Sequence, residues 1–154
     1  MREILFRGQT RRYGEKVRMN GEKVPSNWVY GGCLQGTGVF SIIYGGENEN
    51  DPGENLEKRV VYTDTLGQFI PGLVDKNGKK VFENDIVVIC YETDGEEFSE
   101  TKRVHYNEKE CCWYPMRWEE CCDHCDYYTK IKSIEVIGNI HDNPELLEVA
   151  EDGK

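Results

Sequence analysis

The longest unbroken apolar run in the chain is the six residues Ile86-Val87-Val88-Ile89-Cys90-Tyr91. Four of them are β-branched, which favours a strand, and an unbroken apolar run is typical of a strand covered on both faces. Shortly before this run lies Asp75-Lys76-Asn77-Gly78, with apolar pairs on both sides. Asn-Gly accepts positive φ at both centres of a type I′ turn, so this segment predicts a hairpin. We expect residues 65–91 to organise the chain.

A tight corner is expected between the hairpin and the apolar run, at Glu83-Asn84-Asp85. Apart from glycine, asparagine is the residue that most readily adopts the left-handed conformation that such a corner needs. The sequence therefore predicts a positive φ angle at Asn84.

Shorter alternating stretches predict further strands at 3–8, 28–34, 39–44, 59–62, 101–106, 127–131 and 133–140. The adjacent glycines at 31 and 32 suggest a bulge or a close approach of two backbones. A helix is expected only at 142–150, because Asp142 or Asn143 suits its N-cap and Pro144 its first turn.

Three segments between these strands are rich in turn residues and charge, and we expect them to be loops. Residues 9–27 contain Asn20-Gly21, a second hairpin signal. Residues 45–57 carry five acids and no base, and residues 92–100 are also acidic.

Many short strands and one terminal helix indicate a mainly β protein. The order of the strands from residue 83 onward favours a small SH3-like barrel, with additional N-terminal strands and a short C-terminal helix. We predict a single domain over 1–154. The alternative division has two lobes, 1–62 with N-terminal strands and loops, and 63–150 with the barrel-like part.

The segment G-Q-F-I-P-G-L-V-D-K-N-G-K-K-V-F-E-N-D-I-V, from Gly67 to Val87, resembles the signature of the YopX family of small phage and prophage proteins. The family shows a similar run D-K-N-G-K-x-[IV]-[YF]-E-G-D-I-V. Three further pieces fit in the same order: R-E-I-L-F-R-G from Arg2, N-W-V-Y-G-G from Asn27 and I-E-V-I-G-N-I-H-D-N-P-E-L-L from Ile134.

This resemblance covers most of the chain, and it implies a phage or prophage accessory protein without assigning catalytic residues or a cofactor. The chain departs from the pattern at three places. Asn84 stands where glycine is usual, the segment 69–72 has an extra residue, and the cysteine-rich part at 111–125 is not a family feature.

Charge is distributed unevenly along the chain. The whole carries 19 Lys and Arg against 29 Asp and Glu, a net charge of −10, whereas residues 1–27 carry seven basic against three acidic residues. Such a basic segment, without interleaved aromatic residues, is more typical of a loop that lies over an acidic surface of the same or a neighbouring subunit. The acidic remainder repels a phosphate backbone. We therefore expect a protein partner or self-association, and neither nucleic acid nor a membrane.

Five of the seven cysteines gather at Cys111-Cys112 and in Cys121-Cys122-Asp123-His124-Cys125. The C-x-x-C spacing within the second group suits tetrahedral zinc. Vicinal cysteines weaken that signal, because adjacent residues of a strand point to opposite faces. Free thiols on a hairpin, disulfides formed after isolation, and a redox-active pair are the alternatives. The candidate zinc ligands are Cys112, Cys122, His124 and Cys125, with Cys111 as the alternative to Cys112 and Cys121 as the alternative to His124.

Aromatic residues and an arginine lie between the two groups of cysteines. Trp, Tyr and Arg are enriched at binding hot spots, so the segment is either a surface for a partner or part of the packed interior. The candidate surface residues are Trp113, Tyr114, Arg117 and Trp118.

The sequence contains none of the common motifs for phosphate, dinucleotide, zinc-protease or serine-hydrolase chemistry. We expect His105 to face the surface of a strand rather than to act as a base. Our first hypothesis is a non-enzymatic accessory protein that binds protein or assembles with itself, in the cytoplasm of a bacterial host, since we see no apolar leader. The alternatives are a small nucleic-acid-binding barrel that uses the basic loop, and an acidic decoy of a host nucleic-acid-binding protein.

Overall fold

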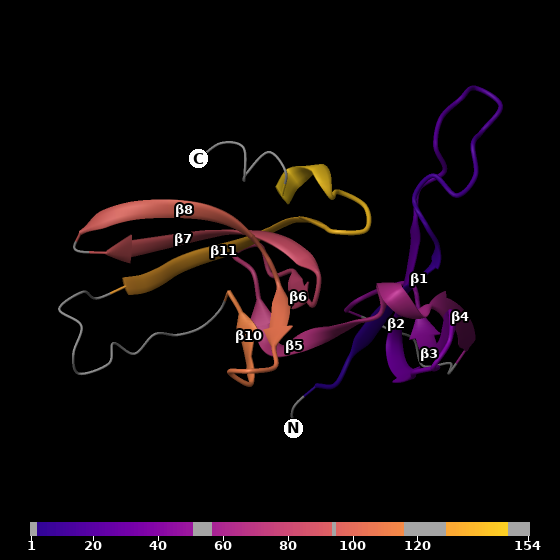
Figure 1. Ribbon diagram of the computed structural model, residues 1–154, viewed down its shortest axis with the longest axis horizontal. Helices are drawn as coiled ribbons and strands as arrows, with labels where there is room; N and C mark the ends of the chain where they lie inside the picture. Colours follow the sequence, from indigo (N-terminus) through magenta and orange to yellow (C-terminus); the bar gives the residue numbers. More distant parts are fainter. Residues whose placement is uncertain (1–2, 51–56, 94, 116–128, 148–154) are drawn as a thin grey trace. The chain divides into compact units, whose positions relative to one another are not determined.

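The computed structural model describes residues 3–50, 57–93, 95–115 and 129–147 (Figure 1). The chain divides into two compact units, Met1–Leu73 and Val74–Lys154. Strands make up most of both units, which confirms the mainly β class.

Five strands and one 3₁₀ turn form the first unit. They are β1 (Phe6–Arg11), β2 (Asn27–Leu34), β3 (Phe40–Gly46), β4 (Lys58–Tyr62), η1 (Thr63–Thr65) and β5 (Gly67–Val74). Hydrogen bonds join the strands in the order β4-β3-β2-β1-β5. The strand expected at 3–8 is observed at 6–11, three residues later in the chain. The strands expected at 28–34, 39–44 and 59–62 are present, and their ends lie within two residues of the predicted ones.

The sheet of the first unit curls around a small core. Val29, Ile43 and Val61 are buried together on its inner face. Gly8 of β1 lies so close to β4 that a β-carbon there would be 2.8 Å from Cγ2 of Val61, so the curl requires glycine at this position. Nevertheless β1 and β4 are not hydrogen-bonded neighbours. No sheet among the described residues closes on itself, and the SH3-like barrel is not confirmed.

Close approach of two backbones occurs at one of the two adjacent glycines of β2. Gly31 lies opposite Gly45 of β3, and a β-carbon on either would collide with a carbonyl oxygen of the facing strand. Gly32 has no such neighbour. The predicted close approach is therefore confirmed at Gly31, and its partner is a second glycine that the sequence pattern did not pair with it.

Residues 12–25 form a hairpin between β1 and β2, which we call the arm (Figure 1). The amide of Gly14 donates to the carbonyl of Val24 at 2.8 Å, and the amide of Val24 donates to the carbonyl of Lys16 at 2.9 Å. The hairpin turn that Asn20-Gly21 predicts is thereby confirmed.

The second unit contains β6 (Lys80–Phe82), β7 (Asp85–Thr93), β8 (Glu96–Arg103), β9 (His105–Asn107), β10 (Cys112–Tyr114) and β11 (Thr129–Asn139). The predicted apolar strand is β7, the middle strand of the order β11-β7-β8. Near its start Ile86 and Val87 are fully buried, whereas Val88, Cys90 and Tyr91 are partly exposed. Coverage on both faces is thus confirmed for one half of the strand only.

Three predictions for the second unit were wrong in detail. The acidic segment 92–100 is mostly strand, because β7 continues to Thr93 and β8 begins at Glu96. The expected strand 101–106 is interrupted at Val104 between β8 and β9. Lys132 lies at a bulge and not in a turn, so the two closing strands are one strand, β11. The helix expected over 142–150 is present at residues 145–147, and 148–150 lie outside the described residues.

The central turn was predicted as type I′, and this was wrong. Positive φ occurs at Gly78 (81°) but not at Asn77. The amide of Asp75 donates to the carbonyl of Lys79 at 2.8 Å, and the amide of Gly78 donates to the carbonyl of Asp75 at 3.0 Å. This pattern is a type I turn closed by a left-handed glycine, the usual three-residue hairpin loop. The arm has the same bonds and a left-handed Gly21 in Arg18–Glu22.

Asp75 is buried, and its side chain selects this longer turn. One carboxylate oxygen accepts the amides of Asn77 and Lys79, both at 2.9 Å, and the other accepts the amide of Val136 at 3.0 Å. Burial raises the pKa of Asp75, but the amide donors outweigh it and hold the pKa below its usual value. Asp75 therefore stabilises the turn and joins it to β11.

We expect Asp75→Asn to lower the free energy of unfolding by about 2 kcal/mol at pH 7, because an amide nitrogen cannot accept the bond from Val136. The lowered pKa means that Asp75 contributes fully above its unfolded pKa of about 3.9 and loses this contribution as pH falls through its folded value. Urea unfolding should therefore show a smaller difference between variant and wild type at about pH 3. The exposed Asp64→Asn is the control, and an equal deficit for Asp75→Asn at both pH values would contradict the assignment.

Candidate protein-binding surface

The candidate surface is the hairpin of β9 and β10, and the corner at Asn84 fixes the point where this hairpin starts. Asn84 has a φ angle of 71°, which confirms the predicted left-handed conformation. Its amide donates to the carbonyl of Val104 at 2.8 Å, and the amide of Val104 donates to the carbonyl of Asp85 at 2.8 Å. Because the Val104 side chain is also fully buried, the residue between β8 and β9 is held at a defined point.

Side chains and a further backbone bond reinforce the corner. Asn84 Oδ1 accepts from Arg103 Nε at 3.1 Å and from Nη2 at 3.0 Å. Asp85 Oδ2 accepts the amide of Phe82 at 2.8 Å, and the amide of Ile140 donates to the carbonyl of Asn84 at 3.0 Å. Segments before, after and far from the corner are thus tied to two adjacent residues.

The two-stranded hairpin of β9 and β10 follows directly from this fixed point. Its antiparallel register pairs His105 with Tyr114, Tyr106 with Trp113, and Asn107 with Cys112. Directly opposite residues share a face of an antiparallel pair, and successive residues alternate between faces. The register therefore places one aromatic pair on each face of the hairpin.

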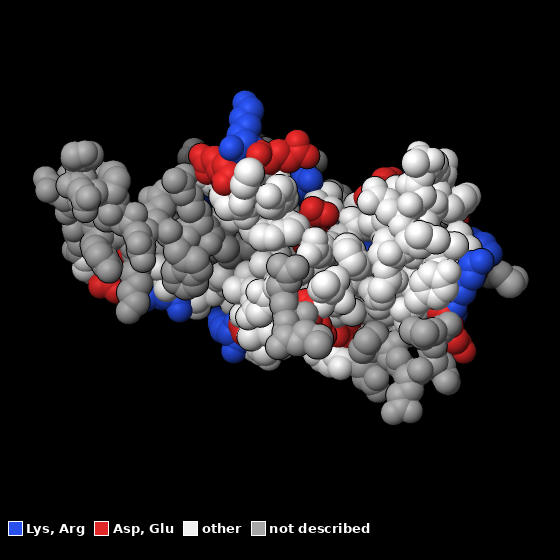
Figure 2. All heavy atoms as spheres, turned by 90° about the horizontal axis from the view of Figure 1, so that it is seen from below, with Lys and Arg blue, Asp and Glu red and all other residues white. Residues whose placement is uncertain are grey.

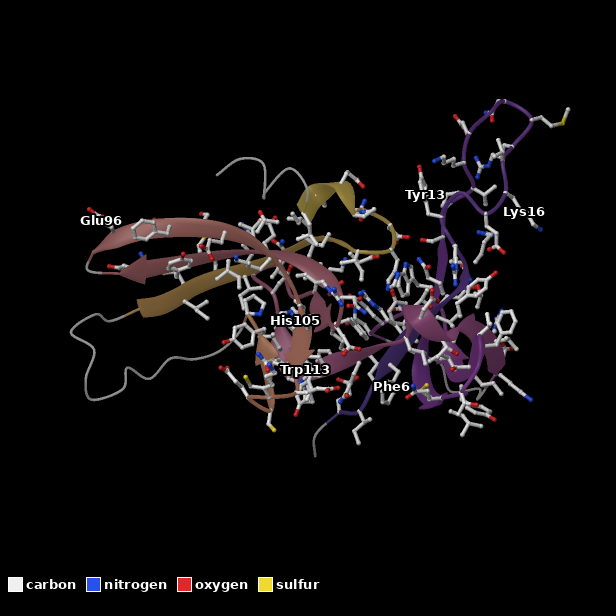
Figure 3. All side chains as sticks on the ribbon, viewed as in Figure 1. Phe6, Tyr13, Lys16, Glu96, His105 and Trp113 are labelled. Atoms are coloured by element: carbon white, nitrogen blue, oxygen red, sulfur yellow. The ribbon has the colours of Figure 1, made fainter. Side chains whose placement is uncertain are left out.

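Both pairs have the geometry of ring–ring contacts. The Tyr106 and Trp113 rings meet edge to face, with centroids 5.2 Å apart and an interplanar angle of 67°. The His105 and Tyr114 rings stack at 5.7 Å and 20°. Figure 3 shows His105 and Trp113 on this hairpin. Tyr106 is 43% exposed and His105 is also exposed, so these rings are held in place yet remain available for contact.

The turn of the hairpin is built on Asn107 and Cys111. Asn107 Oδ1 accepts the amides of Lys109 and Glu110, both at 3.1 Å. Cys111 has a φ angle of 53°, a left-handed conformation that closes the turn. Tyr114 Oη donates to a Glu110 carboxylate oxygen at 3.0 Å, which orients the ring at the far end of the strand.

Two free thiols lie at this turn, Cys111 exposed and Cys112 partly buried. The Cys111 thiol lies 3.6 Å from the carbonyl oxygen of Glu108, and the Cys112 thiol lies 3.9 Å from a Glu110 carboxylate oxygen. Loss of solvent raises the pKa of Tyr106, and the neighbouring Cys111 raises it further, so this phenol is neutral at pH 7.

Of the predicted zinc ligands, Cys112 and its alternative Cys111 are described, whereas Cys122, His124 and Cys125 lie outside the described residues. Within the described ranges no group of three or more His, Cys, Asp or Glu side chains could hold a metal ion. The zinc site therefore stays a prediction.

Of the predicted surface residues, Trp113 and Tyr114 are brought together on β10, whereas Arg117 and Trp118 lie outside the described residues. The structure adds His105 and Tyr106, which the sequence placed on a separate strand. The run Cys112–Tyr114 has no alternating pattern, so the sequence held no signal that would have paired it with 105–107.

Taken by itself, the structure defines a mainly β protein with two units, an exposed aromatic hairpin and a projecting arm. The family model described as YopX protein matches residues 26–148, and the chain belongs to the YopX family. The resemblance at Arg2–Gly8 and the whole arm precede the matched residues. No curated protein and no solved structure is significantly similar to the chain. Among the described residues, no helix has the length and apolar character needed to cross a membrane.

We expect Asn84→Val to destabilise the second unit by about 2 kcal/mol or more, because a β-branched residue is strained at positive φ. Asn84→Gly should cost less, about 1 kcal/mol, since glycine accepts this φ and only the two hydrogen bonds from Arg103 to one side-chain oxygen are lost. Urea unfolding followed by circular dichroism measures both. Asn77→Val, at a turn position without positive φ, is the control, and equal effects of valine and glycine at position 84 would contradict this explanation.

Proposed function

We propose that the chain is a non-enzymatic protein-binding module and that the β9–β10 hairpin is its contact surface. The observation that supports this most is the pair of ring contacts on opposite faces of a three-residue ladder, with Tyr106 and His105 exposed. Aromatic residues in rigid positions lose little conformational freedom when they bind, which is why they dominate hot spots.

The way in which the hairpin is anchored also favours binding. A two-stranded hairpin is marginally stable alone, but this one starts at the buried Val104 and its hydrogen bonds to Asn84 and Asp85. The anchoring holds the rings without covering them. Such a surface offers ring faces and the exposed carboxylate of Glu108, which suits a partner with apolar and basic side chains.

The family resemblance supports the wider setting of the proposal. A phage or prophage accessory protein would meet its partner in the cytoplasm of a bacterial host. In that setting thiols are kept reduced, so Cys111 and Cys112 would stay thiols.

We expect Trp113→Ala and Tyr106→Ala each to weaken partner binding by about thirtyfold, the effect of a typical hot spot. Immobilised full chain would be exposed to bacterial extract under reducing conditions, and the retained proteins quantified by mass spectrometry and then purified for affinity measurement. Phe98→Ala, which removes a partly exposed ring from β8, is the matched control. If the same proteins are retained equally by wild type and both hairpin variants, the hairpin is not the contact surface.

Nucleic-acid binding through the basic segment is the second candidate function, and the structure gives it less support. Two of the arginines are engaged within the protein. Arg11 Nε donates to the carbonyl of Pro25 at 3.0 Å, and Arg12 Nη2 pairs with Asp64 at 2.9 Å. Arg18 lies 3.6 Å from Glu22, which offsets its charge in part. Fewer cations are therefore directed toward a phosphate backbone than the sequence suggested.

The acidic decoy would use β7 and β8, on which Glu92, Glu97 and Glu100 lie. Lys132 pairs with both Glu92 and Glu97, and Lys102 lies 3.9 Å from Glu100. These lysines reduce the negative field of the strands. A basic host protein that the chain retains at low salt, and that DNA displaces, would favour the decoy.

We expect fluorescence anisotropy to show no binding of labelled single- or double-stranded DNA at physiological salt, with any dissociation constant above about 10⁻⁴ M. Tight binding that weakens steeply with salt, and that is lost in Lys16→Glu with Lys23→Glu, would instead establish the nucleic-acid function. The control is Lys102→Glu, which changes a basic residue of β8, outside the arm.

A further inference from the structure

The convex side of β2, β3 and β4 carries apolar residues that no other part of the described first unit covers. The register places Leu34, Ile42 and Val60 side by side, and Phe40 stands two residues before Ile42 on the same side. We call these four residues the outer face. Leu34 is 60% exposed, Phe40 56% and Val60 54%. The core residues Ile43 and Val61 point to the opposite side of the sheet.

The space beside Gly32 agrees that the outer face is open. A β-carbon added to Gly32, which lies on this side two residues before Leu34, would meet nothing within 4 Å. In the view of Figure 2, most of the described surface of the first unit belongs to residues other than Lys, Arg, Asp and Glu. Contiguous exposed apolar residues on a folded unit mark an interaction site.

The arm begins at one end of this face, where a network of side chains holds its base. Arg12 lies over the Tyr62 ring, with Cζ 4.1 Å from the ring centre, and pairs with Asp64. Tyr62 Oη donates to Glu15 at 2.7 Å, and Glu15 also accepts the amide of Arg12 at 3.0 Å. Tyr62 itself packs on Phe40 of the outer face, with ring centroids 5.4 Å apart.

Beyond this base the arm is exposed and partly apolar. Met19 at its tip is fully exposed, and Val17 and Tyr13 are more than half exposed. Figure 3 shows Tyr13 and Lys16 on the arm, projecting away from the strands of the first unit. The network at Tyr62 keeps the arm in this position, so its apolar residues do not cover the outer face of their own chain.

We propose that a second copy of this chain occupies the outer face: two copies dock reciprocally, and the arm of each lies across the outer face of the other. The first unit carries an uncovered apolar face and a partly apolar arm. The network at Tyr62 holds the arm where it cannot cover that face within the same chain. In a two-fold dimer the same contact between arm and face forms twice, so both arms and both outer faces are buried.

Charge complementarity supports a second copy over an unrelated partner. The arm presents Lys16 and Lys23 beside Val17, while Glu47 and Glu49 directly follow β3. In the docked pair, each arm brings its lysines toward these two glutamates of the other copy. Opposite charges at the rim steer such a pairing and fix its register.

Sedimentation equilibrium of the full chain, under reducing conditions and from low to high micromolar concentration, tests the proposal. Wild type should approach twice the 17.8 kDa mass of one chain. Met19→Asp, on the arm, and Val60→Asp, on the face, should each raise the dimer dissociation constant by about thirtyfold or more. Asn77→Asp adds the same charge to the three-residue turn of the second unit and should leave the dimer dissociation constant unchanged. Circular dichroism melting shows that each variant is folded.

Mixing the two variants tests reciprocity. Neither variant alone retains an intact contact between arm and face, whereas a mixed pair retains one, between the arm of the Val60→Asp chain and the face of the Met19→Asp chain. The mixture should therefore associate more tightly than either variant alone. Photo-crosslinking from p-benzoylphenylalanine at position 19 should reach the segments around Leu34 or Val60 of the other copy, and the same group at position 77 should not.

Three results would overturn the proposal: a wild-type chain that keeps the mass of one copy at every concentration, association that survives both aspartate variants, or a mixture that recovers nothing. The inference is independent of the proposed aromatic contact surface, because Trp113→Ala should leave the dimer mass unchanged. Loss of partner binding and loss of the dimer are therefore separately measurable.

Discussion

The left-handed conformation of Asn84 is the constraint on which the second unit depends. It turns the chain sharply between β6 and β7, so that the backbone groups of Asn84 and Asp85 face two other segments. Val104, from the junction of β8 and β9, and Ile140, after the end of β11, both bond to this corner. A buried backbone group must find a partner, so one strained residue sets the positions of three chain segments at once.

The same principle recurs at Asp75. Its carboxylate satisfies the amides of a turn and of a distant strand, Val136, within one buried site. The first site holds Val104, the residue from which the aromatic hairpin starts, and the second joins the central turn to β11. Several buried polar contacts fix the scaffold, and the residues that meet a partner stay exposed on it. Binding surfaces are commonly positioned in this way.

The sequence located the turns correctly, but it did not determine their geometry. Asn-Gly marked both hairpins, yet a two-residue loop and a three-residue loop closed by glycine place the same pair at different positions. The side chain of Asp75 favours the longer loop through bonds that include one to a strand sixty-one residues away. Likewise, Trp113 and Tyr114 stood out by composition, whereas their ring partners on β9 depended on a pairing register that alternation alone does not supply.

What the sequence determined by itself is local: the mainly β class, the family, the left-handed Asn84, and the position of the buried strand β7. The class, the left-handed corner and the strand follow from backbone sterics and from the period of apolar residues, which act over a few neighbours, whereas the family follows from the order of short motifs along the chain. Only the tertiary structure decided that the first sheet curls without closing, that Gly31 faces Gly45, and that rings from β9 and β10 meet. These features depend on pairing between distant segments, and the free energy of such contacts is set by register and burial, which no local pattern encodes.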